Sequence, residues 1–253
     1  MSALRGRTAL VSGGGSGLGA AITRELVDNG VRVVVVGRTR ETLDALVAEF
    51  PQQVHAAVCD VSDPESVAEL RRDLAAEDVS ILINNAGIAG PVADLVDVDP
   101  SAWDEVFAVN VRGTYLMCRQ FLPAMVRRKA GDVVNIASVS GKRPLPGRTP
   151  YCASKMAVLG LTATLSTEVG PSGVSVNSLS PGPIDSARMH RNFTLEAERT
   201  GSTYAEAEAI FVSRSALKRM VTEQEVAGAV VAILSMSGMC GADVDLSAGM
   251  VAR

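Results

Sequence analysis

The sequence is poor in the residues that build metal sites and disulfide frameworks. Its 253 residues include four cysteines, at Cys59, Cys118, Cys152 and Cys240, which lie far apart and form no C-x-x-C pair. This spacing argues against a zinc site and against paired disulfides, and it fits the reducing environment of the cytoplasm. We therefore expect no bound metal and a cytoplasmic location.

An excess of one charge and a long apolar run are also missing. The formal net charge is −4 and the pI is about 5.3, so there is no electrostatic case for binding nucleic acid or an anionic membrane. The longest uncharged stretches, 8–23 and 226–242, contain several glycines and are shorter than the roughly 20 apolar residues of a membrane span. The first residues lead directly into a predicted strand, so no signal peptide is expected.

Aromatic residues and histidines are scarce. Aromatics make up 4% of the chain, with three tyrosines, and there are two histidines. His55 falls in a predicted strand, where a structural role is expected. The hydrophobic content of 47% and the charged content of 21% are ordinary for a soluble globular protein with a substantial core.

Valine-rich runs alternate with helical periodicity along nearly the whole chain. Most of these runs are continuously apolar, as expected for parallel strands that are covered on both faces. The predicted strands are 8–12, 31–36, 54–58, 79–83, 132–138, 174–180 and 243–247. Repeated β-α-β units without a linker predict one doubly wound α/β domain over residues 1–253, with a seven-stranded parallel sheet and helices on both faces. Ligands of such a domain bind beyond the carboxyl ends of the strands.

Capping residues mark two of the predicted helix starts. Ser62 and Glu65 form a capping-box pattern, and Asp99 stands before Pro100 as a cap before a proline in the first turn. We expect a helix to follow each of them.

A glycine-rich segment, SGGGSGLGA, joins the first predicted strand to the first predicted helix. Its glycines let the backbone turn tightly beside a pyrophosphate, and a helix N-terminus offers free N–H groups and a positive dipole end. The G-x-G-x-x-G form is absent, but G-x-G-x-x-A fits Gly15, Gly17 and Ala20, and the spacing of Gly13, Gly17 and Gly19 fits as well. The strand–loop–helix context favours a dinucleotide site over a turn without a ligand. The predicted contacts here are Gly13, Gly15, Ser16, Gly17, Leu18 and Gly19.

The end of the second predicted strand bears on the choice of cofactor. Folds that prefer NAD usually carry an acidic residue about 20 residues beyond the glycine loop, for the ribose hydroxyl. Here Arg38 follows Gly37, and Arg40 comes just after. An arginine suits the 2′-phosphate of NADP. NADP(H) is therefore favoured, and NAD(H) stays possible because exposed arginines are common at helix starts.

Several polar residues stand where apolar ones would be expected. Asn84 ends the fourth predicted strand, Ser138 ends the fifth, and Asn110 lies on an otherwise apolar helix face. Tyr151 and Lys155 are four residues apart in a segment with high helix propensity, so they share one helix face. Taken singly, each of these features is more often structural than catalytic.

Together these features resemble the short-chain dehydrogenase/reductase family. The motifs that carry the resemblance are S-G-x-x-x-G-L-G at 12–19, N-N-A-G at 84–87, Asn110, Ser138, Y-x-x-x-K at 151–155 and P-G at 181–182. They follow the order and spacing of the family along essentially the whole chain. The resemblance implies a Rossmann fold and a hydride transfer between a nicotinamide cofactor and a carbonyl or secondary alcohol.

The resemblance also implies a role for each matching residue. Tyr151 would exchange the proton, Lys155 would lower the pKa of that phenol and bind the nicotinamide ribose, Ser138 would bond the substrate oxygen, and Asn110 would hold a water. Besides the glycine loop, Arg38, Tyr151 and Lys155, the implied cofactor contacts are Asp60, Val61, Asn84, Ala86, Gly87, Pro181, Gly182, Ile184 and Ser186. Two positions depart from the usual pattern: Ser16 stands where many NADP-dependent members carry a basic residue, and Ser186 replaces a threonine.

The segment of about 185–220 has little strand character, and the resemblance implies a mobile lid over the substrate. Its Arg188, His190 and Arg191 would either meet an anionic substrate or, as is more common for exposed charges, simply be solvated. The identity of the small-molecule substrate is not readable, and a 3-oxoacyl-thioester reductase is the main alternative to a general alcohol dehydrogenase. A catalytically silent dinucleotide-binding regulatory protein is the alternative of another class. The resemblance further implies a homotetramer, with a dimer next.

Overall fold

The computed structural model describes residues 4–251, and a seven-stranded parallel sheet crosses it in the order β3-β2-β1-β4-β5-β6-β9. The central strands are buried on both faces, which explains why they read as continuous apolar runs. The strands are β1 Thr8–Ser12, β2 Arg32–Gly37, β3 Val54–Val58, β4 Val79–Asn84, β5 Gly131–Ile136, β6 Val174–Pro181 and β9 Asp243–Leu246. The predicted seven-stranded parallel sheet is therefore confirmed.

One predicted strand end is wrong in a way that affects the site. The fifth strand ends at Ile136, and Ser138 caps a short 3-10 turn, Val139–Gly141, instead of closing the strand. The Ser138 Oγ accepts a hydrogen bond from the backbone N–H of Ser140 at 3.1 Å. Ser138 therefore lies in a turn that follows the carboxyl end of β5.

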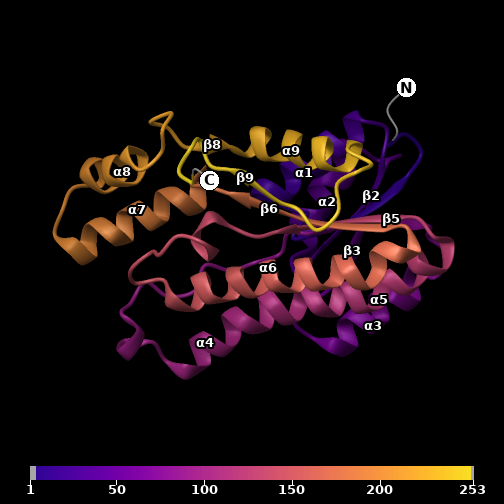
Figure 1. Ribbon diagram of the computed structural model, residues 1–253, viewed down its shortest axis with the longest axis horizontal. Helices are drawn as coiled ribbons and strands as arrows, with labels where there is room; N and C mark the ends of the chain where they lie inside the picture. The colour runs from indigo at the N-terminus through magenta and orange to yellow at the C-terminus, as the bar shows by residue number, and fades with distance from the viewer. Residues whose placement is uncertain (1–3, 252–253) are drawn as a thin grey trace.

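Helices cover both faces of the sheet, as Figure 1 shows. One hydrophobic core joins α1, α2 and α9 to the sheet, and a second core joins α3 and α5 to the opposite face, with α6 against it. The helices are α1 Gly17–Asp28, α2 Arg40–Glu49, α3 Pro64–Asp73, α4 Pro100–Phe107, α5 Gly113–Arg128, α6 Thr149–Val169, α7 Ala187–Thr200, α8 Tyr204–Ser213 and α9 Glu223–Ser235. This three-layer arrangement confirms the predicted α/β architecture.

The two predicted helix caps have different outcomes. The Asp99 carboxylate accepts a hydrogen bond from the backbone N–H of Ser101 at 2.8 Å and caps α4 as predicted. The cap of α3 is Asp63 and not Ser62, because the Asp63 carboxylate accepts from the N–H groups of the first turn. The Ser62 hydroxyl instead donates to Asp60 Oδ1 at 2.7 Å.

The predicted lid segment contains α7 and α8 and a small two-stranded sheet of β7 Ile184–Asp185 and β8 Val221–Thr222. The two helices project beyond the end of the main sheet (Figure 1). Phe193 of α7 is fully buried, and its ring lies 5.4 Å from that of Phe211 on α8. This part of the chain therefore has a small core of its own.

The sheet order reverses between β1 and β4, which are neighbours at its centre. Doubly wound folds bind their ligands at such a reversal, outside the carboxyl ends of the strands. Between residues 4 and 251, no helix has the length and apolar character needed to cross a membrane.

Candidate active site

A cavity of about 1000 Å³ lies beyond the carboxyl ends of the central strands. Its wall is formed by the glycine loop, by the segments that follow β4, β5 and β6, and by the lid helices. The predicted site residues that line it are Gly13, Ser16, Gly17, Leu18, Gly19, Arg38, Asp60, Val61, Ala86, Gly87, Ser138, Tyr151, Lys155, Pro181, Gly182, Ile184 and Ser186. The structure thus brings most of the predicted cofactor and catalytic positions together in one space.

The glycine loop has the geometry that a phosphate site requires. Gly13 and Gly17 have positive φ angles of 63° and 50°. A Cβ on Gly19 would lie 1.9 Å from the carbonyl oxygen of Gly13, so the loop can close on α1 only if residue 19 is glycine. The N-terminus of α1 consequently faces the cavity with free N–H groups, which fits the pyrophosphate of a dinucleotide.

Gly15 was predicted as a cofactor contact but is not part of the cavity wall. A Cβ at this position would lie 2.8 Å from Thr42 Oγ1 and 3.0 Å from Leu43 Cδ2. Gly15 therefore allows the loop to pack closely on α2, on the side away from the cavity.

Ser12, at the end of β1, ties the glycine loop to the segment after β4. Its Oγ accepts hydrogen bonds from the backbone N–H groups of Asn85 at 3.0 Å and Ala86 at 3.1 Å. In return, the Asn85 amide donates to the carbonyl oxygens of Ser12 at 3.0 Å and Gly13 at 3.2 Å. The two segments therefore form one hydrogen-bonded unit at the centre of the site.

Asn84 was also predicted to contact the cofactor, but its side chain does not line the cavity. Its side chain is buried beneath the cavity, where Nδ2 donates to Asn135 Oδ1 at 2.8 Å. Asn135 in turn donates to Thr162 Oγ1 of α6 at 2.9 Å. The neighbouring Asn85 lines the cavity instead, because successive side chains of a strand point to opposite sides.

Arg38 and Asp60 lie in the cavity wall just after β2 and β3. Burial raises the pKa of Asp60, but hydrogen bonds from Ser62 and the charges of Arg38 and Arg112 outweigh it, so the pKa is below its ordinary value. Arg38 is exposed in the cavity wall, whereas Arg40 pairs with Asp44 of its own helix at 2.9 Å. Of these two arginines, Arg38 is therefore the one that faces the cavity.

Tyr151 and Lys155 both face the cavity from α6. Lys155 Nζ lies 5.8 Å from the centroid of the Tyr151 ring and donates to the carbonyl oxygen of Ile136 at 2.7 Å. Lys155 is buried, and burial lowers its pKa from 10.5 to about 7, with a further lowering from the charge of Arg188. A negative charge brought near Nζ would raise that pKa again.

Asn110 lies in a π-helical turn, Ala108–Arg112, between α4 and α5. Its amide donates to the carbonyl oxygen of Ile88 and to Ser154 Oγ, both at 3.0 Å, and accepts from the N–H of Ile88 at 2.8 Å. It is buried and does not line the cavity itself. A Cβ on Gly87 would lie 3.2 Å from Asn110 Oδ1 and 3.5 Å from Lys155 Nζ, so the two groups flank Gly87. π-Helical turns are frequent at functional sites, and the predicted water of Asn110 stays a prediction.

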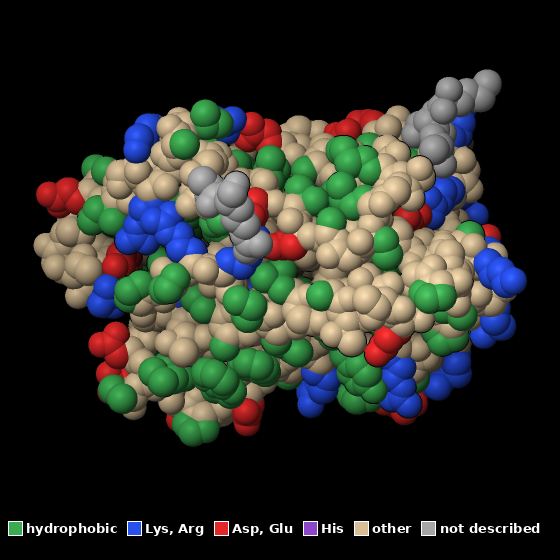
Figure 2. Space-filling model, viewed as in Figure 1, with side chains coloured by type: hydrophobic (Ala, Val, Ile, Leu, Met, Phe, Trp, Pro, Cys, Tyr) green, Lys and Arg blue, Asp and Glu red, His purple; other side chains and the backbone are tan. Residues whose placement is uncertain are grey.

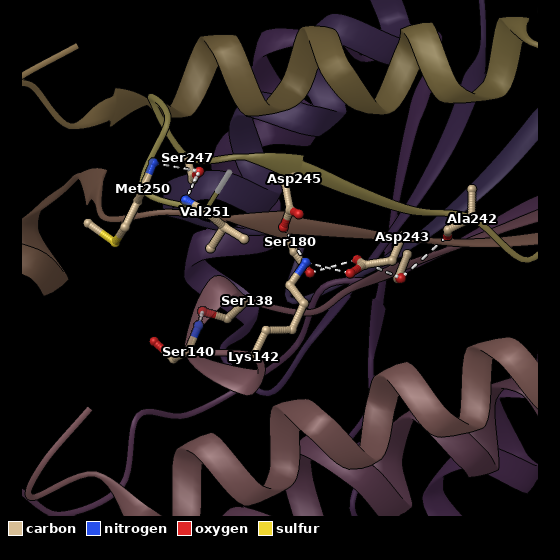
Figure 3. A network of polar contacts seen from close by, with 11 residues as sticks. Ser138, Ser140, Lys142, Ser180, Ala242, Asp243, Asp245, Ser247, Met250 and Val251 are labelled. Carbon is tan, nitrogen blue, oxygen red and sulfur yellow. Dashed lines mark hydrogen bonds and ion pairs between the residues drawn. The ribbon is translucent and has the colours of Figure 1, made fainter. Parts of the chain in front are cut away.

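The turn that carries Ser138 is held by a buried charged network (Figure 3). Just after the turn, Lys142 forms ion pairs with Asp243 and Asp245 of β9, and its side chain is only 6% exposed. Asp243 also accepts a hydrogen bond from Ser180 of β6 at 2.7 Å. The position of Ser138 thus depends on residues more than a hundred positions further along the chain.

The three polar lid residues separate into two groups. Arg188 and Arg191 line the cavity, and Arg188 donates to the carbonyl oxygen of Gly87 at 3.2 Å. His190 does not line it, since its ring bonds to Asp185 Oδ1 at 3.0 Å and to the Tyr204 hydroxyl.

Several residues of this site were not predicted from the sequence, among them Ser12, Asn85, Arg148, Ser154 and Glu223. Ser154 is fully buried between Asn110 and the carbonyl oxygen of Tyr151, and Arg148 and Glu223 line the cavity. The spacing of Ser154, three residues after Tyr151, was a readable signal, because a serine on that helix face meets the same neighbours. The burial of Arg148 and the approach of Glu223 to Gly17 depend on tertiary packing and leave no sequence signal.

Comparisons with known proteins agree with this geometry. Residues 7–197 match the family model described as short chain dehydrogenase. A nodulation protein G from a Rhizobium species is 35% identical over 239 residues, which cover 93% of this chain and 92% of the relative. A 3-oxoacyl-acyl-carrier-protein reductase of Thermotoga maritima is 31% identical, over 98% of this chain and 99% of the relative.

A solved structure supports the same assignment. A variant of actinorhodin polyketide ketoreductase, determined with NADPH, superposes with a TM-score of 0.92 at 28% identity and covers 99% of both chains. With a family model that spans most of the chain and relatives above 30% identity at nearly full length, this protein belongs to the short-chain dehydrogenase/reductase family, the oxidoreductases that act on alcohol and ketone groups.

Proposed function

We propose that the protein transfers a hydride between NADP(H) and a carbonyl or secondary-alcohol substrate, with Tyr151 as the general acid and base. The observation that carries this proposal is that Tyr151, Lys155 and Ser138 line the same cavity as the glycine loop. A bound nicotinamide would supply or accept the hydride, and the residues of this chain would handle the proton and the substrate oxygen.

The proton would move at the Tyr151 hydroxyl. A free phenol has a pKa near 10, which makes it a slow base at neutral pH. The Lys155 ammonium, 5.8 Å from the centroid of the Tyr151 ring, would stabilise the negative charge that forms on the phenol oxygen when the proton leaves. The Ser138 hydroxyl would donate a hydrogen bond to the substrate oxygen as charge develops on it.

Asn110 and Ser154 would act on the position of the tyrosine. The Asn110 amide donates to Ser154 Oγ, which donates to the carbonyl oxygen of Tyr151 at 2.8 Å. This chain of hydrogen bonds fixes the first turn of α6, from which Tyr151 projects.

The preference for NADP(H) rests on Arg38 in the cavity wall, with no acidic residue at that strand end. The glycine loop would hold the pyrophosphate, and Asp60, Val61, Ala86, Gly87, Pro181, Gly182, Ile184 and Ser186 would line the remaining cofactor surface.

The test is steady-state turnover of a panel of ketones and secondary alcohols with NADPH, NADP, NADH and NAD. We expect activity with the phosphorylated cofactor and its loss in Tyr151→Phe. Full activity in that variant would refute the role of the tyrosine, and a strong preference for NADH would refute the choice of cofactor. An absence of turnover with every substrate would favour a dinucleotide-binding regulatory protein.

A 3-oxoacyl-thioester reductase is the second candidate. It is favoured by the similarity to the Thermotoga maritima reductase and to the polyketide ketoreductase. A 3-oxobutanoyl thioester of pantetheine in the substrate panel distinguishes this activity from that of a general dehydrogenase.

The proposed assembly is a homotetramer, or failing that a dimer, in the cytoplasm. Tyr115 of α5 is 47% exposed and Met156 of α6 is 50% exposed, and a Cβ on Gly160 of α6 would meet no atom within 4 Å. Figure 2 shows hydrophobic side chains over the lower part of this face, where α4 and α6 lie. These features support pairing of α5 and α6 with a second subunit, which light scattering of the purified protein tests.

A further inference from the structure

The lid end of the cavity carries far more positive than negative charge. Six arginines line it, Arg143, Arg148, Arg188, Arg191, Arg199 and Arg214, and the acidic residues of the cavity wall that interact with them are Glu196 and Glu223. Glu196 already pairs with Arg199 at 2.8 Å. Figure 2 shows basic side chains gathered over the region of α7. The space next to Tyr151 therefore has an excess of positive charge.

Arg148 differs from the other arginines because it is buried. Only 9% of the residue is exposed, and burial lowers its pKa. Its hydrogen bonds run from Nη1 to the carbonyl oxygens of Gly90 at 3.3 Å and Ala89 at 3.5 Å, both longer than an ordinary N–H···O bond. No carboxylate of residues 4–251 forms an ion pair with it.

A buried guanidinium without an anion is costly for the fold. Arginine has five N–H donors, and the Nε and Nη2 groups of Arg148 have no hydrogen-bond partner among the described residues. Buried charges are ordinarily paired. Since Arg148 also lines the cavity, an anion bound in the cavity could pair with its guanidinium.

The topology places Arg148 on the substrate side of the cavity. It directly precedes α6, three residues before Tyr151, in the segment that follows β5. Arg38, the candidate for the cofactor phosphate, follows β2, and β1 and β4 stand between β2 and β5 in the sheet. The charge of Arg148 is therefore separate from the phosphate-binding end of the site.

We propose that the substrate is an oxo or hydroxy carboxylate whose carboxylate pairs with Arg148 while its reacting oxygen meets Tyr151 and Ser138. This inference rests on the proposed oxidoreductase function and names its substrate class. A carboxylate is planar and carries one negative charge, so it matches the fork of a single unpaired guanidinium in bidentate fashion. Leu145, Ile210 and Phe211 also line the cavity and offer apolar contacts to the carbon chain between the two groups.

The test compares each acid with its own neutral ester. The probes are 3-oxobutanoate, 4-oxopentanoate and 5-oxohexanoate, their methyl esters, and the pantetheine thioester of 3-oxobutanoate, each with NADPH and NADH. We expect at least one acid to exceed its ester about 100-fold in kcat/KM, mainly through a lower KM. In Arg148→Met that ratio falls to near one, and Arg148→Lys keeps part of it. Arg127→Met removes an exposed arginine of α5 outside the cavity and serves as the matched control, with an unchanged ratio.

A binding measurement provides a second readout that needs no turnover. Titration calorimetry with the preferred acid should show heat of binding in the wild type and in Arg127→Met, and none in Arg148→Met, whose thermal unfolding confirms that it is folded. If the esters or the thioester are turned over as efficiently as the acids, the carboxylate proposal is wrong and the oxidoreductase function stands. Absence of turnover with every probe and every neutral ketone would instead refute the oxidoreductase function, and this proposal with it.

Discussion

Replacing Lys155 by methionine should stabilise the cofactor-free protein while abolishing its activity. Lys155 is buried and has no acidic partner in residues 4–251, and its pKa is lowered from 10.5 to about 7. At 1.4 kcal/mol for each pKa unit, this difference corresponds to about 5 kcal/mol of unfavourable free energy when the buried amine is charged. The lost hydrogen bond to the carbonyl oxygen of Ile136 offsets about 1–3 kcal/mol. We therefore expect Lys155→Met to have a free energy of unfolding about 2–4 kcal/mol higher than that of the wild type at pH 6.

The pH dependence of the free energy of unfolding provides a more specific test of this prediction. Between the lowered pKa of about 7 and the ordinary 10.5, the unfolded chain binds a proton at Lys155 that the folded chain has released. The free energy of unfolding of the wild type therefore rises with pH in this window, at up to about 1.4 kcal/mol per pH unit from this group. Lys155→Met lacks this contribution, so its advantage should shrink steadily from pH 7 to pH 10.

The assay is urea unfolding of both proteins without cofactor, at one protein concentration, from pH 6 to pH 10. Groups other than Lys155 titrate in both proteins, so the difference isolates the lysine. Lys142→Met provides the contrast, because Lys142 is buried but paired with Asp243 and Asp245, and its loss should destabilise by about 3–5 kcal/mol. Lys129→Met, at an exposed position, should change little. If the difference in free energy of unfolding between the wild type and Lys155→Met stays constant with pH, the reasoning is wrong.

Three further predictions concern the cofactor. Arg38→Ala should raise the KM for NADPH about tenfold or more and leave that for NADH nearly unchanged, and equal effects on both would contradict a 2′-phosphate contact. Burial raises the pKa of Glu223. The Oε1 atom of Glu223 would lie 3.3 Å from a Cβ on Gly17, in the glycine loop. NADPH binding should therefore weaken as the pH rises through that pKa, because the carboxylate becomes charged. Glu223→Gln should tighten binding about fivefold at high pH and remove this dependence, which fluorescence titration with NADPH measures. Gly19→Ala should abolish NADPH binding, since its Cβ would meet the carbonyl oxygen of Gly13. A Gly19→Ala protein that binds NADPH normally would show that the loop can adopt another shape.

Features that depend on local periodicity could be predicted from the sequence. The strands could be predicted because a parallel strand that is buried on both faces is apolar along most of its length, as β1 is. Tyr151 and Lys155 share a helix face simply because they are four residues apart. The glycine loop was recognisable because Gly13 and Gly17 adopt positive φ angles that other residues avoid.

Features that depend on contacts between distant segments could not be predicted. Whether Asn84 or Asn85 lines the cavity is decided by the phase of the side-chain alternation in β4, and an error of one residue reverses it. The π-helical turn around Asn110 has no sequence signature, and it redirects that side chain toward Ile88 and Ser154. In the sequence, Arg148 cannot be distinguished from an exposed loop arginine. It is buried only because the loop after β4 packs against it.

The ion pairs of Lys142 have a consequence for the order in which the site is made during protein synthesis. The glycine loop, Tyr151 and Lys155 all precede β9 along the chain, but the turn of Ser138 is tied through Lys142 to Asp243 and Asp245. A ribosome-bound chain that has not yet exposed residue 245 can form most of the sheet, yet it leaves a buried lysine without its anions. The nascent protein should therefore form the proposed dinucleotide-binding surface before the turn of Ser138 is fixed, so that the complete site is formed only when the last strand is added.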